Sequence, residues 1–287
     1  MFGNKIATIL AESWDTIYIN SLFSIDFALL PLWKIKRGNQ KIVLAPRGML
    51  HEGALSIKPI KKKLFLFMAR TTKLYSNVIW QASSKEEYER IRLHFPKSQI
   101  EILSNLSPQK PVQLNPLVKV EGKPLKLIMV SRIARVKNIK FFIEILNEVK
   151  FPYELEIYGS LEEQDYWDNC VQLVELNKLK VTYCGILPIS ELNHKLSQFH
   201  LFVSPSLGEN FGHSILESLN SSTPVLISDK TPWRQLESRH VGFDLSLENK
   251  EIWLDKLQKI NGMSNEEYQL WREGAWKMAQ KQLDQTE

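Results

Sequence analysis

The chain has 287 residues, of which 44% are hydrophobic and 24% charged, and its net charge is +5. This length fits two domains of ordinary size, and this composition excludes a disordered or fibrous protein. Two cysteines, Cys170 and Cys184, give no disulfide framework and match no metal-binding spacing. They fit reduced thiols in a cytoplasmic protein.

The chain shows no signal for export or for a membrane span. Its first ten residues lack the apolar core and cleavage site of a secretory signal. The longest apolar stretch, residues 17–35, contains Asn20, Asp26 and Pro31. We therefore expect a strand followed by a helix there, and a cytoplasmic location for the protein.

The charge is unevenly spread. Residues 1–118 carry 17 Lys/Arg against 8 Asp/Glu, a balance of +9, and residues 119–287 carry 20 against 24, a balance of −4. The excess peaks between Lys58 and Met68, where four lysines precede or flank an apolar run. One interpretation is a solvated helix face. The other is a peripheral contact with anionic lipid on the cytoplasmic face of the inner membrane, or with an anionic substrate. No nucleic-acid motif accompanies these lysines, so we expect no nucleic-acid partner.

Short apolar runs alternate with helical patterns along the whole chain, which predicts α/β domains with parallel sheets covered by helices. The runs are 16–20, 41–45, 78–82, 100–103, 127–131, 155–158, 181–183, 201–203 and 225–227, and residues 139–149 show helical spacing. Residues 107–124 contain four prolines and no clear period, and are the best linker candidate. We expect domains over 1–118 and 119–287, with the alternative that the final helix returns to the first domain.

Two cations follow the run 127–131. Arg132 leaves the expected strand, and Lys137 stands at the expected start of the next helix. In doubly wound sheets ligands bind beyond the carboxyl ends of the strands. Two cations beside a helix N-terminus can hold a pyrophosphate there. An ordinary basic loop is the other interpretation of this pair taken alone.

The segment GENFGHSILE, residues 208–217, follows the run 201–203. Its glycines permit close backbone approach, and we expect a helix to begin near Gly212, with free N–H groups that add donors for the same anion. Glu209 precedes this helix, and Glu217 lies inside it, placed to accept hydrogen bonds from ribose hydroxyls. A capped helix with two solvated glutamates is the plainer alternative. The expected donor contacts of this segment are Glu209, Asn210, Phe211, Gly212, His213 and Glu217.

Together these motifs resemble those of the retaining glycosyltransferases of family 4, which have the GT-B fold of two Rossmann-like, doubly wound domains facing a cleft. Arg132 and Lys137 match the family's R-x4-K pair, and Glu209 and Glu217 match its E-x7-E motif. The segments SDKTPW (228–233) and APRGML (45–50) resemble loops of bacterial members that build surface polysaccharides. The second loop belongs to the acceptor domain of these proteins, so Arg47 and Gly48 are the acceptor-side candidates.

The resemblance implies transfer of a sugar from a nucleotide diphosphate to a hydroxyl of a glycan or polyprenyl-linked acceptor, with retention of the anomeric configuration. The leaving diphosphate gains negative charge, which Arg132 and Lys137 would stabilise. Glu209 would position the donor sugar as a catalytic residue, and Gly185 lies where family members receive the base. The resemblance implies no metal ion and no cofactor beyond the nucleotide sugar, and the chain has no Asp-x-Asp triplet.

Two departures from the family pattern matter. Many members carry a histidine where this chain has Arg47. Members also begin with a strand, a Gly-rich loop and a further strand–helix unit, and no such unit precedes residues 16–20. We therefore expect a truncated first domain. The rival hypothesis is a non-catalytic nucleotide-sugar-binding subunit, or an inactive remnant, that needs a partner chain.

Overall fold

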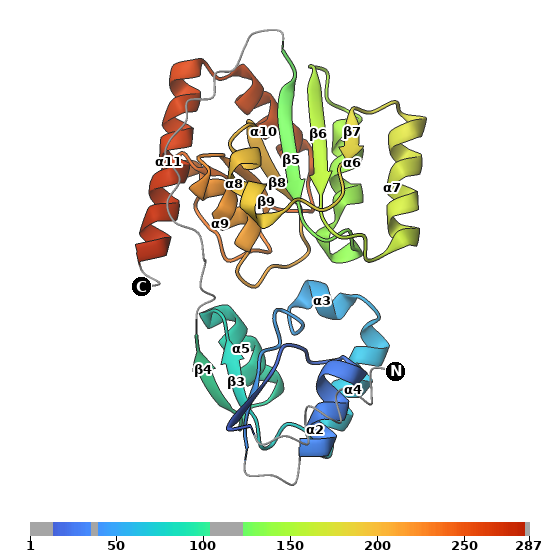
Figure 1. The fold of residues 1–287 in the computed structure, drawn as a ribbon. Coiled ribbons are helices and arrows are strands. Elements are labelled where there is room, and N and C mark those ends of the chain that lie inside the picture. The colour runs from blue at the N-terminus through green and yellow to red at the C-terminus, as the bar shows by residue number, and fades with distance from the viewer. Residues whose placement is uncertain (1–13, 36–39, 104–122, 285–287) are drawn as a thin grey trace. The chain divides into compact units, whose positions relative to one another are not determined.

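The computed structural model describes residues 14–35, 40–103 and 123–284. Its contacts divide the chain into two units. The first comprises residues 1–105 with 208–211, and the second comprises residues 106–207 with 212–287. Each unit contains one parallel sheet with helices packed on it (Figure 1). The expected linker over 107–124 lies almost entirely outside the described residues.

The first unit has a four-stranded sheet in the order β1-β2-β3-β4, and every neighbouring pair is parallel. Its strands are β1 (Thr16–Ile19), β2 (Lys41–Leu44), β3 (Ile79–Ala82) and β4 (Gln99–Ile102). The spatial order equals the chain order, so within the described residues β1 and β4 are the edges. The expectation of a truncated first domain agrees with this small sheet.

Helical segments connect these strands. They are a π-helical turn η1 (Ile25–Leu29), α2 (Leu30–Ile35), α3 (Glu52–Ser56), α4 (Pro59–Thr71) and α5 (Lys85–His94). Trp80 is fully buried in the core of this unit and stacks on Phe95, with ring centroids 4.7 Å apart. The aromatic contact joins β3 to the end of α5, so the helix that follows β3 is held against the strand.

The second unit has a six-stranded parallel sheet in the order β10-β9-β8-β5-β6-β7. Its strands are β5 (Leu125–Val130), β6 (Tyr153–Tyr158), β7 (Val181–Tyr183), β8 (Leu201–Ser204), β9 (Val225–Ser228) and β10 (Gly242–Leu245). All residues of β8 and β9 are buried, as expected for central strands that are covered on both faces. The strand order reverses between β5 and β8, which is the place where doubly wound sheets bind ligands.

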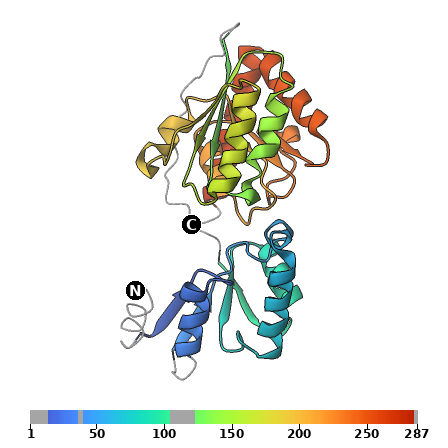
Figure 2. The same cartoon turned by 90° about the vertical axis from the view of Figure 1, so that its right-hand side faces the viewer.

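Two groups of helices cover this sheet. One group packs α6 (Ile139–Leu146) against α7 (Gln164–Leu176) and α10 (Lys250–Gly262). The other packs α9 (His213–Asn220) against α8 (Ile189–Leu196) and the long α11 (Asn265–Asp284). Figure 2, turned by 90°, shows α6 and α7 side by side. The last described helix therefore packs on α9 of its own unit.

The structure confirms the predicted α/β architecture with two Rossmann-like parallel-sheet domains. The nine predicted strands are present with shifts of a few residues, and the sequence analysis missed β10. Residues 17–35 form β1 followed by η1 and α2, as predicted. In the part of the chain that the structure describes, no helix has the length and apolar character needed to cross a membrane.

Candidate nucleotide-sugar site

The loop after β5 carries the two cations of the candidate site. Arg132 is exposed, and its guanidinium forms an ion pair with Glu162 at 2.7 Å. Lys137 is partly exposed and ends a 3-10 turn, η2 (Arg135–Lys137). The helix α6 starts at Ile139, two residues after the expected start at Lys137. Asn138, which lies between η2 and α6, adopts a left-handed conformation (φ 54°) and separates the two.

The loops after β5 and β6 touch at their backbones. The Ile133 N–H donates to the Ser160 carbonyl oxygen (2.8 Å), and a Cβ on Gly159 would lie only 1.8 Å from the carbonyl oxygen of Ser131. Gly159 also has a φ of 146°, so only glycine fits this approach. The sequence analysis missed Gly159, although a glycine directly after an apolar strand is a recognisable signal. This contact places Arg132 beside Glu162.

The helix after β8 begins where the sequence predicted. Gly212 is its N-cap in a left-handed conformation (φ 79°), and His213 is the first helical residue. A Cβ on Gly212 would lie 2.7 Å from Ile215 Cδ1 and 3.3 Å from Trp233 Nε1, so Gly212 is closely packed. Glu217 is buried in this helix with an exposed fraction of 6%, and His213 is exposed.

The preceding residues of the motif, Glu209, Asn210 and Phe211, are partly exposed and lie on the segment 208–211 that groups with the first unit. The two glutamates of the motif thus belong to different units. Glu217 is carried by a helix that packs on the second sheet, and Glu209 by the connecting segment.

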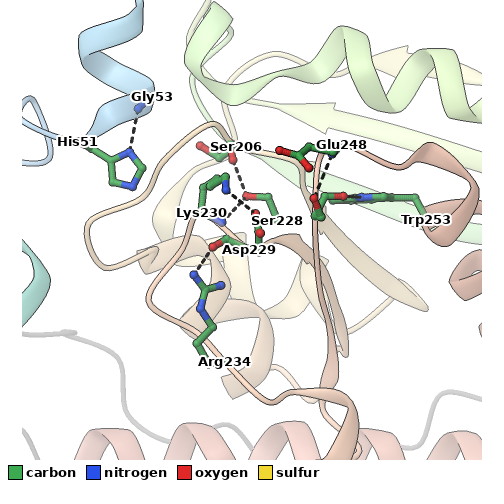
Figure 3. A network of polar contacts seen from close by, with 10 residues as sticks. His51, Gly53, Ser206, Ser228, Asp229, Lys230, Arg234, Glu248 and Trp253 are labelled. Atoms are coloured by element: carbon green, nitrogen blue, oxygen red, sulfur yellow. Dashed lines mark hydrogen bonds and ion pairs between the residues drawn. The ribbon is translucent and has the colours of Figure 1, made fainter.

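Hydrogen bonds join the loop after β5, the turn after β8 and the end of β9. The Ser206 hydroxyl and the Leu207 N–H both donate to the Val136 carbonyl oxygen, at 3.1 and 2.8 Å. The Ser228 hydroxyl donates in turn to the Ser206 carbonyl oxygen, and Figure 3 shows this bond beside Lys230. Because Val136 precedes Lys137, the cationic loop lies directly against the turn that leads from β8 into the E-x7-E segment.

The loop after β7 is bound to the end of β6. The Gly159 N–H donates to the Gly185 carbonyl oxygen (2.8 Å), and the Tyr183 hydroxyl donates to the Gly159 carbonyl oxygen (2.8 Å). Gly185 is partly exposed and left-handed (φ 75°). Its carbonyl oxygen therefore accepts a hydrogen bond within the protein, and Ile186, which follows it, is exposed.

A polar cluster under this loop was not foreseen from the sequence. The Tyr158 hydroxyl donates to Glu156 Oε2 (2.5 Å), and the Lys195 ammonium lies 2.9 Å from the same oxygen. Burial alone would raise the pKa of the Glu156 carboxyl, but these two groups outweigh it and hold the pKa below its usual range. The only sequence signal is that the strand YELEIY carries two glutamates, Glu154 and Glu156, among its apolar residues.

The acceptor-side candidates lie in the first unit, directly after β2. Arg47 is exposed and Gly48 partly exposed. Both are left-handed, with φ of 50° and 78°. The Arg47 guanidinium donates to Asn20 Oδ1 (3.1 Å) and to the Tyr18 hydroxyl (3.2 Å), which come from β1 and its end. Sequence reasoning singled out neither Tyr18 nor Asn20 as a site residue.

His51, which was not assigned to the site, has a structural role in the first unit. His51, shown in Figure 3, caps α3 by accepting a hydrogen bond from the Gly53 N–H (3.1 Å). Among the residues that the structure describes, no three His, Cys, Asp or Glu side chains gather as a metal site would require.

Comparison with known proteins identifies the family. The model of the family "Glycosyl transferases group 1" matches residues 115–274, and the chain belongs to this family. A curated relative is the UDP-N-acetylglucosamine–peptide N-acetylglucosaminyltransferase GtfA subunit of Streptococcus pneumoniae, 28% identical over 107 residues, which are 36% of this chain and 20% of the relative. The chain thus spans only a small part of that relative's length.

Solved structures share the fold. Anabaena HepE with UDP-glucose has a TM-score of 0.76 at 14% identity, over 98% of this chain and 78% of that one. S. aureus TarM, solved with UDP and α-GlcNAc-glycerol, has a TM-score of 0.67 at 18% identity, over 88% of this chain and 50% of that one. At these identities the likeness establishes the GT-B fold alone.

Proposed function

We propose that this chain is a retaining glycosyltransferase that moves a sugar from a nucleotide diphosphate to a hydroxyl of a glycan or lipid-linked acceptor in surface polysaccharide biosynthesis. The observation that carries the proposal is the bonding of Ser206 and Leu207 to Val136. It brings the Arg132–Lys137 loop against the turn that leads to the α9 N-terminus. Both features favour a diphosphate.

The chemistry needs stabilisation of a leaving nucleoside diphosphate. Arg132 and Lys137 supply positive charge for it without a metal ion, and the first N–H groups of α9 supply neutral donors. Glu217 would bind the ribose, Glu209 would position the donor sugar, and Arg47 with Gly48 would face the acceptor. The UDP-glucose bound to HepE and the UDP bound to TarM support a nucleotide-diphosphate donor for this chain.

The test is a binding screen on the purified chain. A ligand that binds only the folded state raises its apparent stability, by about 2.7 kcal/mol at a concentration 100 times the dissociation constant. We expect thermal stabilisation by one nucleoside diphosphate and by its nucleotide sugar, confirmed by calorimetry, and slow release of the diphosphate from that sugar. A chain that no nucleoside diphosphate stabilises would refute the proposal.

A peripheral membrane contact is the second part of the proposal. On α4, Ile60, Leu64 and Phe67 follow one another at helical spacing, and each is more than half exposed. Lys61 and Lys63 lie beside them and are also exposed. An apolar stripe flanked by lysines suits an anionic bilayer surface, where each lysine contributes about 1 kcal/mol at low salt.

Liposome co-sedimentation tests this contact. Binding should rise with anionic lipid content, fall with salt, and fall in a Leu64→Ser, Lys61→Gln, Lys63→Gln variant. Lys140→Gln, an exposed lysine of the second unit, is the matched control. If binding depends neither on anionic lipid content nor on salt concentration, the proposed membrane contact is wrong.

A non-catalytic subunit is the second candidate function, and the position of β1 favours it. Within the described residues β1 pairs with β2 alone, so its other edge presents backbone groups that can receive a strand from a partner. The matched relative is itself named as a subunit. On this hypothesis the chain binds a nucleotide sugar and transfers it poorly until a partner or a further segment completes the first domain. Robust transfer by a monomeric preparation of residues 1–287 would exclude it.

A further inference from the structure

The first unit contains a buried carboxylate that the proposed reaction does not use. Glu87 is the third residue of α5, and its exposed fraction is 2%. The helix is capped by Ser84, whose hydroxyl accepts a hydrogen bond from the Glu87 N–H (3.2 Å). A glutamate at this position commonly turns back to the N–H of the capping residue. Here the Glu87 carboxylate instead bonds to Ser83, the residue before the cap, and to the loop after β2.

Three donors converge on this carboxylate. The Ser83 N–H and the Ser83 hydroxyl both donate to Oε2, each at 2.8 Å, and the Gly48 N–H donates to Oε1 at 2.8 Å. Hydrogen bonds to an ionised carboxylate are stronger than those between neutral groups, and the N-terminal turn of α5 also favours negative charge. Glu87 therefore ties the end of β3 to the loop after β2.

The loop that Glu87 holds is strained. Arg47 is left-handed with a φ of 50°, which is unfavourable for a residue with a side chain. Such a conformation persists only where the surroundings enforce it, and it is frequent at functional sites. The Glu87–Gly48 bond fixes the backbone of this turn. Asn20 and Tyr18 fix the guanidinium at 3.1 and 3.2 Å.

We propose that Glu87 is the positioning residue of the acceptor side of the site: by holding the Gly48 N–H it keeps Arg47 in its left-handed conformation and its guanidinium on Asn20 and Tyr18. The proposal rests on the proposed function for the acceptor-side role of Arg47. Without the Glu87 charge, the turn can relax to an ordinary conformation, and the guanidinium leaves the ends of β1 and β2.

The first experiment measures the turn directly. Hydrogen exchange of the Gly48 amide is compared in the parent chain, Glu87→Gln and Glu86→Gln, where Glu86 is the exposed neighbour on the same helix. Loss of a hydrogen bond to a charged group should speed exchange about tenfold to hundredfold in Glu87→Gln. Glu86→Gln should match the parent. Unchanged Gly48 exchange in Glu87→Gln would overturn the proposal.

A second variant separates positioning from general loss of stability. Ser83→Ala removes one hydrogen bond from Oε2 and leaves the Gly48 bond to Oε1 in place. Gly48 should stay protected from exchange. Turnover is not the readout of this variant, because the Ser83 hydroxyl also accepts a hydrogen bond from Asn210 Nδ2 (2.8 Å), one of the expected donor contacts. If Ser83→Ala speeds Gly48 exchange as much as Glu87→Gln does, the effect comes from loosening of α5, and the proposal is wrong.

The functional readout is the release of nucleoside diphosphate from the nucleotide sugar found in the binding screen. Glu87→Gln should reduce its rate about as much as Arg47→Ala does, and the double variant should lose no more than either single one. Affinity for the nucleoside diphosphate should stay within about twofold of the parent. Losses that multiply in the double variant would overturn the proposal. A parent chain that binds no nucleotide would refute the proposed function instead, and Gly48 exchange would still decide the role of Glu87.

Discussion

The hydroxyl of Ser206 donates a hydrogen bond to the carbonyl oxygen of Val136 across 3.1 Å and 70 positions of sequence. One residue follows an apolar strand and the other precedes the lysine of the R-x4-K pair. The bond holds the turn after β8 against the cationic loop after β5. Since β5 and β8 are neighbours at the point where the strand order reverses, we expect the proposed diphosphate subsite at their carboxyl ends.

The cationic pair should dominate nucleotide affinity. We expect Arg132→Ala and Lys137→Ala each to weaken binding of the nucleoside diphosphate by about 1.5–3 kcal/mol, because each removes a charge-assisted hydrogen bond. Arg135→Ala is the matched control, since Arg135 is on the same loop and forms an ion pair with Glu163 at 3.2 Å. Calorimetry that finds Arg132→Ala as tight as the parent would reject the diphosphate role.

The two glutamates should separate into a nucleotide contact and a sugar contact. Glu217→Gln should weaken the nucleoside diphosphate and the nucleotide sugar alike, by about 1.5–3 kcal/mol, because it removes the charge of the buried carboxylate that we propose binds the ribose. Glu209→Gln should leave nucleoside diphosphate affinity unchanged and depress turnover. Glu191→Gln, on the exposed start of α8, serves as the control. If Glu209→Gln and Glu217→Gln lose equal affinity for the nucleoside diphosphate, this division of roles is wrong.

Replacing Gly212 by alanine should destabilise the protein. An alanine there would adopt a φ of 79° and place its Cβ 2.7 Å from Ile215 Cδ1. A left-handed conformation costs a non-glycine residue about 1–2 kcal/mol, so Gly212→Ala should lower the free energy of unfolding by at least that amount and weaken nucleotide binding. In contrast, a Cβ at Gly262, the last residue of α10, meets no atom within 4 Å. Gly262→Ala should therefore leave binding unchanged and raise the free energy of unfolding slightly, by about 0.4–1 kcal/mol, because alanine favours the helical conformation.

The two thiols should differ in reactivity with pH. Burial raises the pKa of the Cys170 thiol to about 11, and burial together with the Glu156 charge raises that of the exposed Cys184. Only the thiolate reacts with iodoacetamide, so a raised pKa means slow labelling at pH 7 and a rate that keeps rising above pH 9. Mass spectrometry should find Cys184 labelled first and Cys170 only in denaturant.

The charge near Cys184 can be changed to check this cause. In Glu156→Gln the raising influence of the carboxylate is lost and the Lys195 ammonium is left to favour the thiolate, so Cys184 should react faster at pH 8. Glu154→Gln, on the same strand but exposed, should not change the rate. If Glu156→Gln leaves the labelling rate of Cys184 unchanged, burial alone raises the pKa of this thiol.

Local sequence patterns determined much of this protein. Short apolar runs marked nine of the ten strands, because strands that are covered on both faces contain consecutive apolar residues such as Leu201, Phe202 and Val203 in β8. The alternation of strands and helices predicted that the sheets are parallel. The motifs at 132–137 and 208–217 pointed to the carboxyl ends of β5 and β8, since the position of a residue relative to its own strand is local information.

Contacts between distant segments were decided only by the tertiary structure. The sequence shows Glu87 as one of several glutamates at the start of a helix, and its bond to the Gly48 N–H, 39 positions away, becomes visible only when β2 and β3 lie side by side. The Glu156 cluster depends likewise on α8 bringing Lys195 to Glu156 of β6, and the strand β10 on pairing with β9. Such hydrogen bonds join residues tens of positions apart, and no periodicity in a short window records them.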